Sequence, residues 1–369
     1  MKQNGAGKIA IFIPSLSGGG AERAMLNLAH GFADSGCEAE LVLASASGPY
    51  LDKVHNTIRL VDLKAGRVLA SLPNLVSYLR SNRPDALISS LDYANIVALW
   101  ARRLAGTPSR MAINDQNTIS RSAYNSARRR QRIVPALMKQ FYPWADYVIG
   151  NSQGVADDLV KLTGLPPERI HILYNPVVTP ELKEKVQAPL DHPWFVAGEP
   201  PVILAVGRLT KQKDFPMLLQ AFAQVRQRRP ARLMILGEGP DRSALETQVK
   251  QLGLEGEVSM PGFVENPYGY MQRATVFVLS SLWEGLPTVL IEALYCSVPV
   301  VSTDCPSGPR EILRDGQYGQ LVPMSEPGIL AQAIETTLSG KNIPPPPESW
   351  RPYELETVVS QYTHLLLGN

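Results

Sequence analysis

The 369-residue chain is poor in cysteine and has no long hydrophobic run. Its three cysteines, Cys37, Cys296 and Cys305, show no metal-ligand spacing, which predicts free thiols in a reducing compartment. No apolar stretch approaches the roughly 20 residues of a membrane-spanning helix. The apolar part of the amino-terminal segment is too short for a signal peptide. We therefore expect a cytoplasmic protein.

Charge is also sparse, and two arrangements of charged or titratable residues are absent. Charged residues make up 19% of the chain and the net charge is only +2, too little to argue for a nucleic-acid partner. No Asp-x-Asp pair occurs, so the usual carboxylate pair for a catalytic divalent metal is missing. The five histidines show no pairing at catalytic spacing. We expect neither a metal nor another cofactor.

What the chain does have is enough apolar sequence, 44%, for two domains of ordinary size. Short Val- and Ile-rich strands alternate with amphipathic helices, which predicts an α/β fold with two doubly wound parallel sheets. A Pro-rich, non-periodic stretch separates the two series. The predicted organisation is a first domain over 1–180, a linker over 181–200, a second domain over 201–345 and a carboxy-terminal segment over 346–369.

The stretch Ser280–Val300 is the most informative part of the sequence. It follows a predicted strand and reads as a Gly/Pro turn and then a helix, with Glu284 at the turn and Glu292 in the helix. The first amides of a helix have no intrahelical partner and carry partial positive charge, which makes them an anion site. These amides belong to residues near the turn: Leu286, Thr288 and Val289. A carboxylate such as Glu284 beside that site suits hydroxyl groups attached to the anion.

A second loop carries two cations between a buried strand and a helix. The strand Pro201–Val206 is followed by Gly207, Arg208 and, five residues later, Lys213. Arginine gives fork-like contacts and lysine a point charge, so together they suit a diphosphate. In isolation, an Arg and a Lys on a loop more often form only a solvated surface.

The amino-terminal loop Ser17–Gly20 lets the backbone approach a ligand closely. The G-x-G-x-x-G dinucleotide pattern fails, because Arg23 stands at the third glycine position. No acidic residue follows the next strand to hold an NAD ribose. The loop is therefore a weak candidate for NAD and a fair one for a phosphate or a sugar.

The segment between Asp115 and Asp146 contains no acidic residue and six basic ones. Its apolar residues fall on one helical face: Ile133, Val134, Leu137, Met138, Phe141 and Tyr142. Such a helix, over about Arg128–Trp144, can lie on the inner, anionic face of a membrane. Two other interpretations stay open: a core-facing helix with a solvated basic rim, and arginines that bind an acceptor diphosphate.

The two glutamates of the 280–300 stretch resemble the E-x7-E motif of retaining GT-B glycosyltransferases, and the surrounding phrases resemble the GT4 family, especially bacterial surface-polysaccharide transferases. The resemblance implies two Rossmann-like domains that face a central cleft, with the last helix crossing back onto the first, acceptor-binding domain. It implies that Glu284 contacts donor-sugar hydroxyls, Glu292 the nucleotide ribose, and Arg208 and Lys213 the diphosphate. The predicted catalytic residues are Glu284, Arg208 and Lys213. The predicted substrate-binding residues are Gly19, Gly20, Gln116, Asn117, Gly207, Val264, Gly285, Leu286, Thr288, Val289 and Glu292.

One loop departs from that family. Relatives often carry a histidine in a phrase such as E-H-N, and here the matching residues are Asp115, Gln116 and Asn117. Gln116 can hydrogen-bond a sugar hydroxyl but cannot titrate, so a role for histidine at this point is in doubt.

The resemblance implies metal-independent transfer of a hexosyl group with retention of configuration. We expect a nucleoside-diphosphate sugar as co-substrate, with UDP favoured over GDP, and a saccharide or polyprenyl-diphosphate-linked acceptor in cell-surface polysaccharide synthesis. Two alternatives stay open: a sugar-nucleotide epimerase of similar shape, and a non-catalytic nucleotide-binding scaffold subunit. The products distinguish them: a glycoside, an epimerised sugar nucleotide, or nothing.

Overall fold

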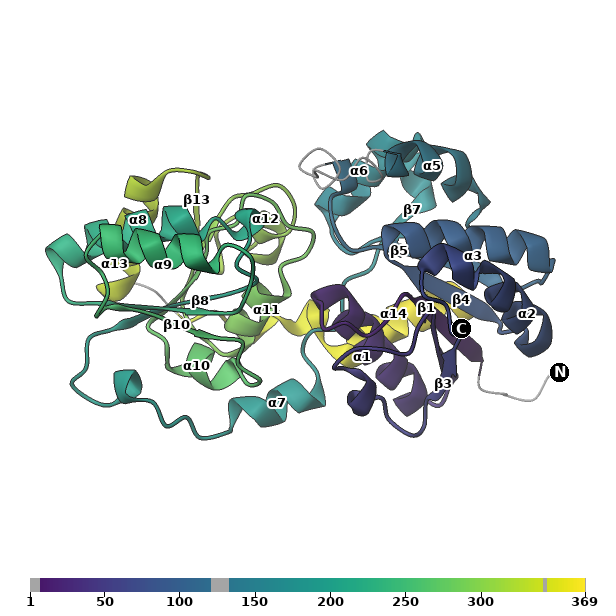
Figure 1. The fold of residues 1–369 in the computed structure, drawn as a ribbon, viewed down its shortest axis with the longest axis horizontal. Coiled ribbons are helices and arrows are strands. Elements are labelled where there is room, and N and C mark those ends of the chain that lie inside the picture. Colours follow the sequence, from purple (N-terminus) through teal and green to yellow (C-terminus); the bar gives the residue numbers. More distant parts are fainter. Residues whose placement is uncertain (1–6, 121–132, 341–343, 369) are drawn as a thin grey trace. The chain divides into compact units, whose positions relative to one another are not determined.

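A computed structural model describes residues 7–120, 133–340 and 344–368 of the chain. The chain divides into two compact units (Figure 1). Unit 1 comprises Met1–Val177 with Tyr353–Asn369, and unit 2 comprises Val178–Pro352. Each unit contains one parallel sheet with helices packed on it.

Unit 1 has a seven-stranded sheet in which all neighbouring strands are parallel. Across the sheet the strands are β3 (Arg59–Asp62), β2 (Glu38–Leu43), β1 (Lys8–Ile13), β4 (Ala86–Ser90), β5 (Arg110–Asp115), β6 (Tyr147–Gly150) and β7 (Ile170–Ile172). The helices are α1 (Gly20–Asp34), α2 (Leu72–Asn82), α3 (Asp92–Ala105), α5 (Val134–Phe141), α6 (Gln153–Thr163) and α14 (Leu355–Leu367). Single 3₁₀ turns include η1 (Leu51–Lys53), η2 (Val68–Ser71), η4 (Tyr142–Trp144) and η5 (Pro167–Arg169).

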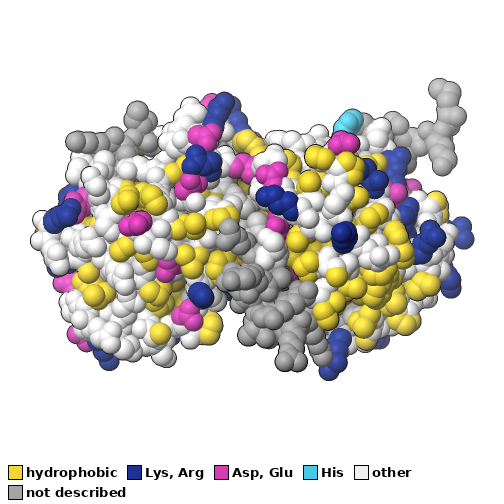
Figure 2. Space-filling model, turned by 90° about the horizontal axis from the view of Figure 1, so that it is seen from above, with side chains coloured by type: hydrophobic (Ala, Val, Ile, Leu, Met, Phe, Trp, Pro, Cys, Tyr) yellow, Lys and Arg dark blue, Asp and Glu magenta, His cyan; other side chains and the backbone are white. Residues whose placement is uncertain are grey.

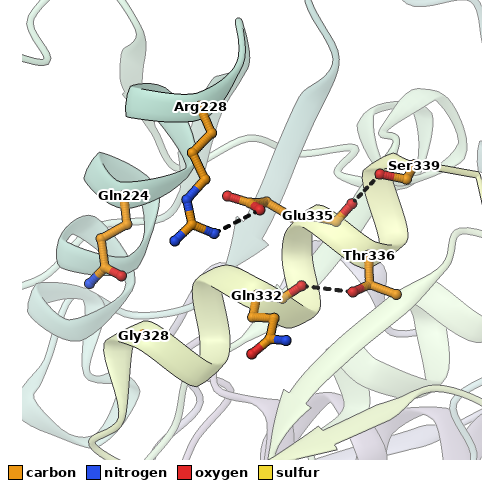
Figure 3. A pocket seen from close by; sticks show the side chains of 7 residues that line it. All are labelled: Gln224, Arg228, Gly328, Gln332, Glu335, Thr336 and Ser339. Atoms are coloured by element: carbon orange, nitrogen blue, oxygen red, sulfur yellow. Dashed lines mark hydrogen bonds and ion pairs between the residues drawn. The ribbon is translucent and has the colours of Figure 1, made fainter.

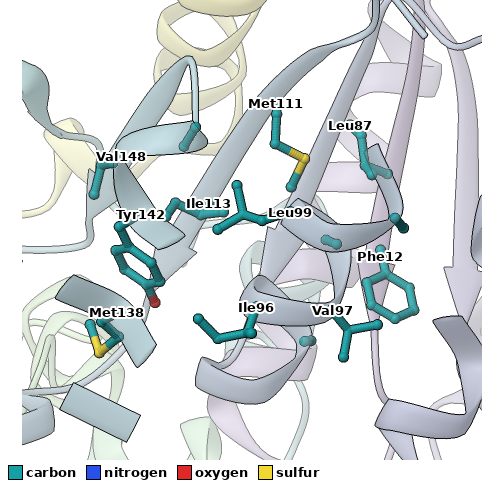
Figure 4. Packing of buried hydrophobic residues seen from close by; sticks show 14 of the residues in the cluster. Phe12, Leu87, Ile96, Val97, Leu99, Met111, Ile113, Met138, Tyr142 and Val148 are labelled. Atoms are coloured by element: carbon teal, nitrogen blue, oxygen red, sulfur yellow. The ribbon is translucent and has the colours of Figure 1, made fainter. Parts of the chain in front are cut away.

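Alternate residues of the central strand β1 enter two different hydrophobic cores. Ala10 and Phe12 pack in the core shared with α2, α3, α5 and α6, part of which is drawn in Figure 4. Ile9, Ile11 and Ile13 pack in the core shared with α1 and α14. Because both faces of the sheet are covered, the strands read as continuous apolar runs, as expected for a doubly wound sheet.

The carboxy-terminal helix α14 packs against α1 in unit 1. Its buried residues Val358 and Tyr362 belong to the same core as Phe32 of α1. Gly31 allows the close approach, because a Cβ there would lie 2.3 Å from Cγ2 of Val359. The prediction that the last helix returns to the first domain is confirmed.

Unit 2 has a six-stranded sheet, again parallel throughout. Its strand order is β10 (Val258–Gly262), β9 (Arg232–Leu236), β8 (Val202–Val206), β11 (Val276–Leu279), β12 (Val300–Thr303) and β13 (Gln320–Val322). Its helices are α7 (Pro180–Val186), α8 (Phe215–Arg228), α9 (Arg242–Gln251), α10 (Tyr268–Arg273), α11 (Thr288–Tyr295), α12 (Pro309–Ile312) and α13 (Pro327–Leu338). Its 3₁₀ turns include η6 (Pro193–Phe195), η7 (Lys211–Lys213) and η8 (Pro347–Ser349). The predicted α/β class with two parallel sheets is confirmed.

The basic segment is only partly described, since residues 121–132, with most of its arginines, lie outside the described residues. Of the predicted apolar face, Val134, Met138 and Tyr142 are buried in the core of unit 1. Ile133 and Trp144 are exposed, at 57% and 39%. Leu137 and Phe141 are half-buried and pack against the same core, so the core-facing interpretation holds for five of the six residues of this face, with Ile133 as the exception.

Candidate active site

Three neighbouring strands of unit 2 end in loops that are joined backbone to backbone. The N–H of Gly207, directly after β8, donates to the carbonyl of Leu236 at 2.9 Å. The N–H of Gly237 donates to the carbonyl of Gly262 at 2.8 Å. Gly237 has a φ of +141°, and a Cβ there would lie 2.0 Å from the carbonyl oxygen of Gly207. Glycine at 237 thus fixes the loop that carries Arg208 against the end of the sheet.

The two groups predicted to serve the diphosphate and the sugar form an ion pair. Nζ of Lys213 lies 2.6 Å from Oε1 of Glu284, and their side chains are 15% and 8% exposed. The Ser281 hydroxyl donates to the same oxygen at 2.6 Å, and Nε2 of Gln212 lies 3.4 Å from Oε2. The stem of Lys213 crosses Gly207, where a Cβ would lie 3.0 Å from Cε. A cation and a carboxylate thus lie in contact at the carboxyl end of the sheet, where open α/β sheets bind ligands.

The turn from Glu284 to Pro287 is held by the segment that follows β12. The N–H of Glu284 donates to the carbonyl of Pro306 at 3.1 Å, and the Ser307 hydroxyl donates to the carbonyl of Gly285 at 2.8 Å. Gly308 has a φ of +92°, and a Cβ there would lie 2.3 Å from Cδ of Pro287. These contacts fix the direction of the Glu284 side chain by fixing its backbone.

Helix α11 begins directly after this turn, with Pro287 as its N-cap residue. Thr288 and Val289 are its first residues and are half-buried, and Leu286 just before them is buried. Glu292 lies inside the helix and is 1% exposed. Burial of the Cys296 thiol, followed by the charge of Glu292, raises the pKa of that thiol to about 12. The two glutamates therefore occupy the predicted positions, one before the helix and one within it.

Arg208 differs from Lys213 in that its guanidinium has no ion-pair partner among the described residues. The Arg208 side chain is exposed and makes no hydrogen bond with any residue that the structure describes. A cation with its donors free can bind an anionic ligand without breaking a contact within the protein. Burial and the charge of Glu284 raise the pKa of the Cys305 thiol, so this cysteine remains an inert thiol beside the ion pair.

Val264 follows β10, is half-buried and lies next to Phe263, which is 76% exposed.

The remaining predicted residues belong to unit 1. Gly19 is the N-cap residue of α1, and Oε2 of Glu22 lies 2.3 Å from where a Gly19 Cβ would stand. Beyond Gly20 there is open space, since a Cβ would meet nothing within 4 Å.

Gln116 and Asn117 follow β5. Gln116 is half-buried and hydrogen-bonded to three asparagine side chains, so it is more firmly held than a loop residue usually is. Asn117 is half-buried, and its Oδ1 accepts from the N–H of Thr118 at 2.9 Å.

A separate pocket of about 570 Å³ lies between α8 and α13 and contains none of the predicted site residues (Figure 3). It is lined by amides, hydroxyls and one ion pair, in which Arg228 lies 2.9 Å from Oε2 of Glu335. Its lining includes no aromatic side chain on which a sugar or a base could stack.

Among the described residues there is no cluster of three or more His, Cys, Asp or Glu side chains that could hold a metal ion. Within the same residues, no helix combines the length and the apolar character that a membrane span needs.

The comparisons with known proteins agree with this geometry. The profile described as Glycosyl transferases group 1 matches residues 190–354, and the profile described as Glycosyltransferase Family 4 matches residues 18–180. The fold and the strand-end loops are those of a glycosyltransferase with two Rossmann-like domains.

The chain belongs to the group 1 glycosyltransferases, with an amino-terminal half of family 4. It is 32% identical over 353 residues to a Campylobacter jejuni N-acetylgalactosamine-N,N'-diacetylbacillosaminyl-diphospho-undecaprenol 4-alpha-N-acetylgalactosaminyltransferase, covering 90% of each chain. It is 29% identical over 351 residues to a second C. jejuni alpha-1,4-N-acetyl-D-galactosaminyltransferase, covering 91% of this chain and 90% of the relative. Anabaena HepE in complex with UDP has the same fold, with a TM-score of 0.77, 20% identity, and coverage of 98% of this chain and all of that one.

Sequence reasoning missed the residues that hold the ion pair. Ser281 and Gln212 gave no signal, because a serine or a glutamine near a strand end is common. The segment Pro306–Gly308 lies in a phrase that resembles relatives, but nothing local says that it contacts the turn after Glu284. Only the parallel pairing of β11 with β12 brings these two loops together.

Proposed function

We propose that this glycosyltransferase transfers a hexosyl group from a nucleoside-diphosphate sugar, a UDP-sugar by preference and a GDP-sugar as the alternative, with retention of configuration. The observation that carries the proposal is the contact of Lys213 with Glu284 at the carboxyl end of the unit 2 sheet, beside the free guanidinium of Arg208. The UDP-bound neighbour supports the choice of UDP.

The chemistry follows from the charges. Negative charge develops on the diphosphate as the bond to the anomeric carbon breaks, and Arg208, Lys213 and the first amides of α11 can stabilise it electrostatically. When a diphosphate takes Lys213, Glu284 becomes free to accept hydrogen bonds from the hydroxyls of the donor sugar. Glu292 is the residue proposed for the ribose. No metal is needed for this charge stabilisation, and a donor phosphate oxygen would take the proton of the attacking hydroxyl.

The first test is calorimetric binding of UDP, GDP, ADP and NAD without added metal. We expect one nucleoside diphosphate to bind, and Arg208→Ala to weaken it about tenfold or more, since a charge-assisted hydrogen bond contributes about 1.5–3 kcal/mol. Arg229→Ala, at a half-buried arginine of the same unit that is not among the predicted site residues, is the control. Unchanged binding with EDTA supports metal independence. Binding of none of the four, or equal binding by both variants, would contradict the proposed donor site.

The proposed acceptor is a saccharide linked to a polyprenyl diphosphate, in the synthesis of a cell-surface polysaccharide. Two relatives whose names specify undecaprenol-linked substrates support this choice. A protein that elongates such lipids works at the inner face of the membrane, and unit 1 offers a surface for it. Figure 2 shows hydrophobic side chains gathered on the unit 1 half of one face.

Exposed apolar side chains lie on α3, on η4 and at the residue directly before α5, with basic residues close in the chain, as a contact with anionic lipid requires. Leu104 and Ile133 are each 57% exposed, and Trp144 is 39% exposed. The Arg103 guanidinium lies 5.7 Å from the Trp144 ring, and Lys139 is exposed on α5. The proposed contact over Arg128–Trp144 thus gains α3 as a second element, whereas residues 128–132 lie outside the described residues.

Sedimentation with vesicles tests this surface. We expect the protein to bind vesicles that contain phosphatidylglycerol and not vesicles of phosphatidylcholine alone. Leu104→Ser with Trp144→Ser should lower the bound fraction about tenfold or more, because two exposed apolar side chains lose their insertion energy. Ile329→Ser, at a residue 44% exposed on unit 2, is the matched control. Equal binding by the double variant and the control would exclude this face.

Product analysis separates transfer from the two alternatives. A glycoside supports the proposed function, an epimerised sugar nucleotide would indicate an epimerase, and nucleotide binding without turnover would indicate a scaffold subunit. The ion pair of Lys213 with Glu284 favours an enzyme. A scaffold that only bound nucleotide would need no carboxylate in contact with the lysine that binds the diphosphate.

A further inference from the structure

A network of amide side chains lies at the carboxyl ends of three strands of unit 1. Gln116, after β5, donates from Nε2 to Oδ1 of Asn114 at 2.8 Å. Its Oε1 accepts from Nδ2 of Asn151, after β6, at 3.1 Å and from Nδ2 of Asn175, after β7, at 2.7 Å. Asn114 in turn donates from Nδ2 to the hydroxyl of Tyr362 on α14. The three asparagines and the tyrosine are at most 2% exposed, and Gln116 is half-buried.

One backbone carbonyl sets the orientation of every amide in this network. The Asn151 side chain lies 3.2 Å from the main-chain oxygen of Gln116, and only an N–H can donate to a carbonyl. The group of Asn151 at that point is therefore Nδ2. The side-chain atom of Gln116 that faces the same Nδ2 must then be its oxygen, and its nitrogen must face Oδ1 of Asn114. The remaining neighbour of that Gln116 oxygen, Asn175, must likewise present its nitrogen.

This orientation leaves two buried amide oxygens without a hydrogen-bond partner among the described residues. Within the described part of the chain, Oδ1 of Asn151 and Oδ1 of Asn175 are buried and have no hydrogen-bond partner. A buried polar network with unpaired members is destabilising relative to a satisfied or an apolar one. Stability alone does not explain why three asparagines converge on one glutamine at the end of a sheet.

The network leaves the Gln116 side chain with one free hydrogen-bonding group. Both acceptor positions of Oε1 are used by Asn151 and Asn175, and one N–H of Nε2 is used by Asn114. A single N–H remains, and Gln116 is the half-buried member of the network. The side chain is therefore held as a hydrogen-bond donor and cannot serve as an acceptor.

We propose that Asn151 and Asn175 are positioning residues that hold the Gln116 amide as a fixed donor to an oxygen of the acceptor saccharide. This inference rests on the proposed function together with the acceptor-binding first domain that the family resemblance implies. The selected group is an oxygen that can accept, such as an acetamido carbonyl or a sugar hydroxyl. The Gln116 amide does not itself titrate.

Asn175→Asp and Asn175→Ala together test the direction of the Gln116 amide. At about pH 8 the Asp carboxylate faces Oε1 of Gln116 and forces the amide to turn, so the free donor is lost. At about pH 5.5 a buried Asp is protonated and can again donate to Oε1, which restores the original direction. Asn175→Ala removes one donor but leaves Asn151 to hold the orientation.

Transfer is measured from UDP-N-acetylgalactosamine to an undecaprenyl-diphosphate-linked N-acetylhexosamine saccharide. Relative to wild type at the same pH, we expect Asn175→Asp to raise the acceptor KM tenfold or more at about pH 8 and less than threefold at about pH 5.5. Asn175→Ala should raise it less than Asn175→Asp does at about pH 8, and by the same factor at both pH values, with the donor KM unchanged throughout. A merely structural role would make alanine as harmful as aspartate and give no recovery in acid. A rise in the donor KM instead would also overturn the proposal.

The side-chain amide resonances of ¹⁵N-glutamine-labelled protein give a readout that needs no turnover. Gln116 is assigned by its loss in Gln116→Glu. We expect its two N–H protons to differ in wild type, to shift downfield together in Asn175→Asp at about pH 8, and to return at about pH 5.5. An unchanged Gln116 signal in that variant would overturn the inference. If Asn175→Asp shows the shift and wild-type protein transfers no sugar, only the proposed function is refuted.

Discussion

Replacing Glu284 with alanine should lower kcat about 100-fold or more and leave the affinity for UDP unchanged or higher. The two effects diverge because Glu284 now holds Lys213, at 2.6 Å, away from any diphosphate. Without the carboxylate, Lys213 is free for the nucleotide, while the donor sugar loses a hydrogen-bond acceptor needed to orient it for transfer. Initial rates and calorimetric UDP binding measure the two quantities.

Glu257→Ala is the matched control for Glu284→Ala. Glu257 lies in the same unit and is also paired, at 3.0 Å, with Arg226, but it is not among the predicted site residues. We expect its kcat to stay within about twofold of wild type. If Glu284→Ala weakened UDP binding in proportion to its loss of turnover, Glu284 would be a scaffold for the loop and not a sugar-binding residue.

Lys213→Met with Glu284→Ala separates stability from catalysis. Each single change leaves one charge of a largely buried pair unpaired, which should cost about 2 kcal/mol of unfolding free energy, less than for a fully enclosed pair. The double variant leaves no unpaired charge, so its stability should exceed that of either single variant while activity stays low. If the loss of unfolding free energy in the double variant equalled the sum of the losses in the two single variants, contacts other than this ion pair would determine the stability of the site.

The local part of this site could be predicted from the sequence, and the long-range part could not. A strand, a Gly/Pro turn and an apolar helix place Glu284 before α11 and Glu292 within it, because each feature acts over a few residues. The contact between Lys213 and Glu284 joins residues 71 positions apart and arises only when β8 and β11 pair. Composition and residue spacing do not show which strands pair or in which register. Neither the ion pair nor the hydrogen bond from Ser281 to Glu284 could therefore be predicted from the sequence.

The same limit explains Gln116. The sequence identified it as a polar residue that replaces a histidine of relatives. It did not show that Asn175, 59 positions away, would fix the direction of its amide. For the helix α5, the helical periodicity of apolar residues predicted the apolar face. It did not predict which of these residues pack against the sheet and which remain exposed. Tyr142 and Trp144 are two residues apart, and one is fully buried while the other is 39% exposed.

Replacing Asp115 with asparagine should stabilise the protein increasingly as the pH rises. Asp115 is fully buried, and burial, followed by the charge of Asp92, raises its pKa well above the ordinary value. The charge of Asp158 adds to this, whereas hydrogen bonds from the Tyr142 hydroxyl, at 3.1 Å, and the Asn95 amide, at 3.4 Å, oppose it. Oδ2 of Asp115 has no hydrogen-bond partner among the described residues.

The sign follows from proton linkage. Between the unfolded pKa of about 3.9 and the higher folded pKa, the folded protein binds more protons than the unfolded chain, so stability falls as the pH rises through this window. Above the folded pKa the full penalty of a buried charge remains. Asparagine keeps an oxygen that can accept hydrogen bonds from Tyr142 and Asn95, but it does not ionise. The unfolding free energy of the variant should therefore not fall as the pH rises through this window.

Denaturant unfolding at about pH 5 and about pH 8 measures the difference. The gain of Asp115→Asn over wild type should be small at the lower pH and on the order of 1–2 kcal/mol at the higher one, the size expected when a buried unpaired charge is neutralised. Asp34→Asn, at the exposed end of α1, is the control and should show no such trend. A gain that is the same at both pH values would mean that Asp115 stays in one protonation state across this range.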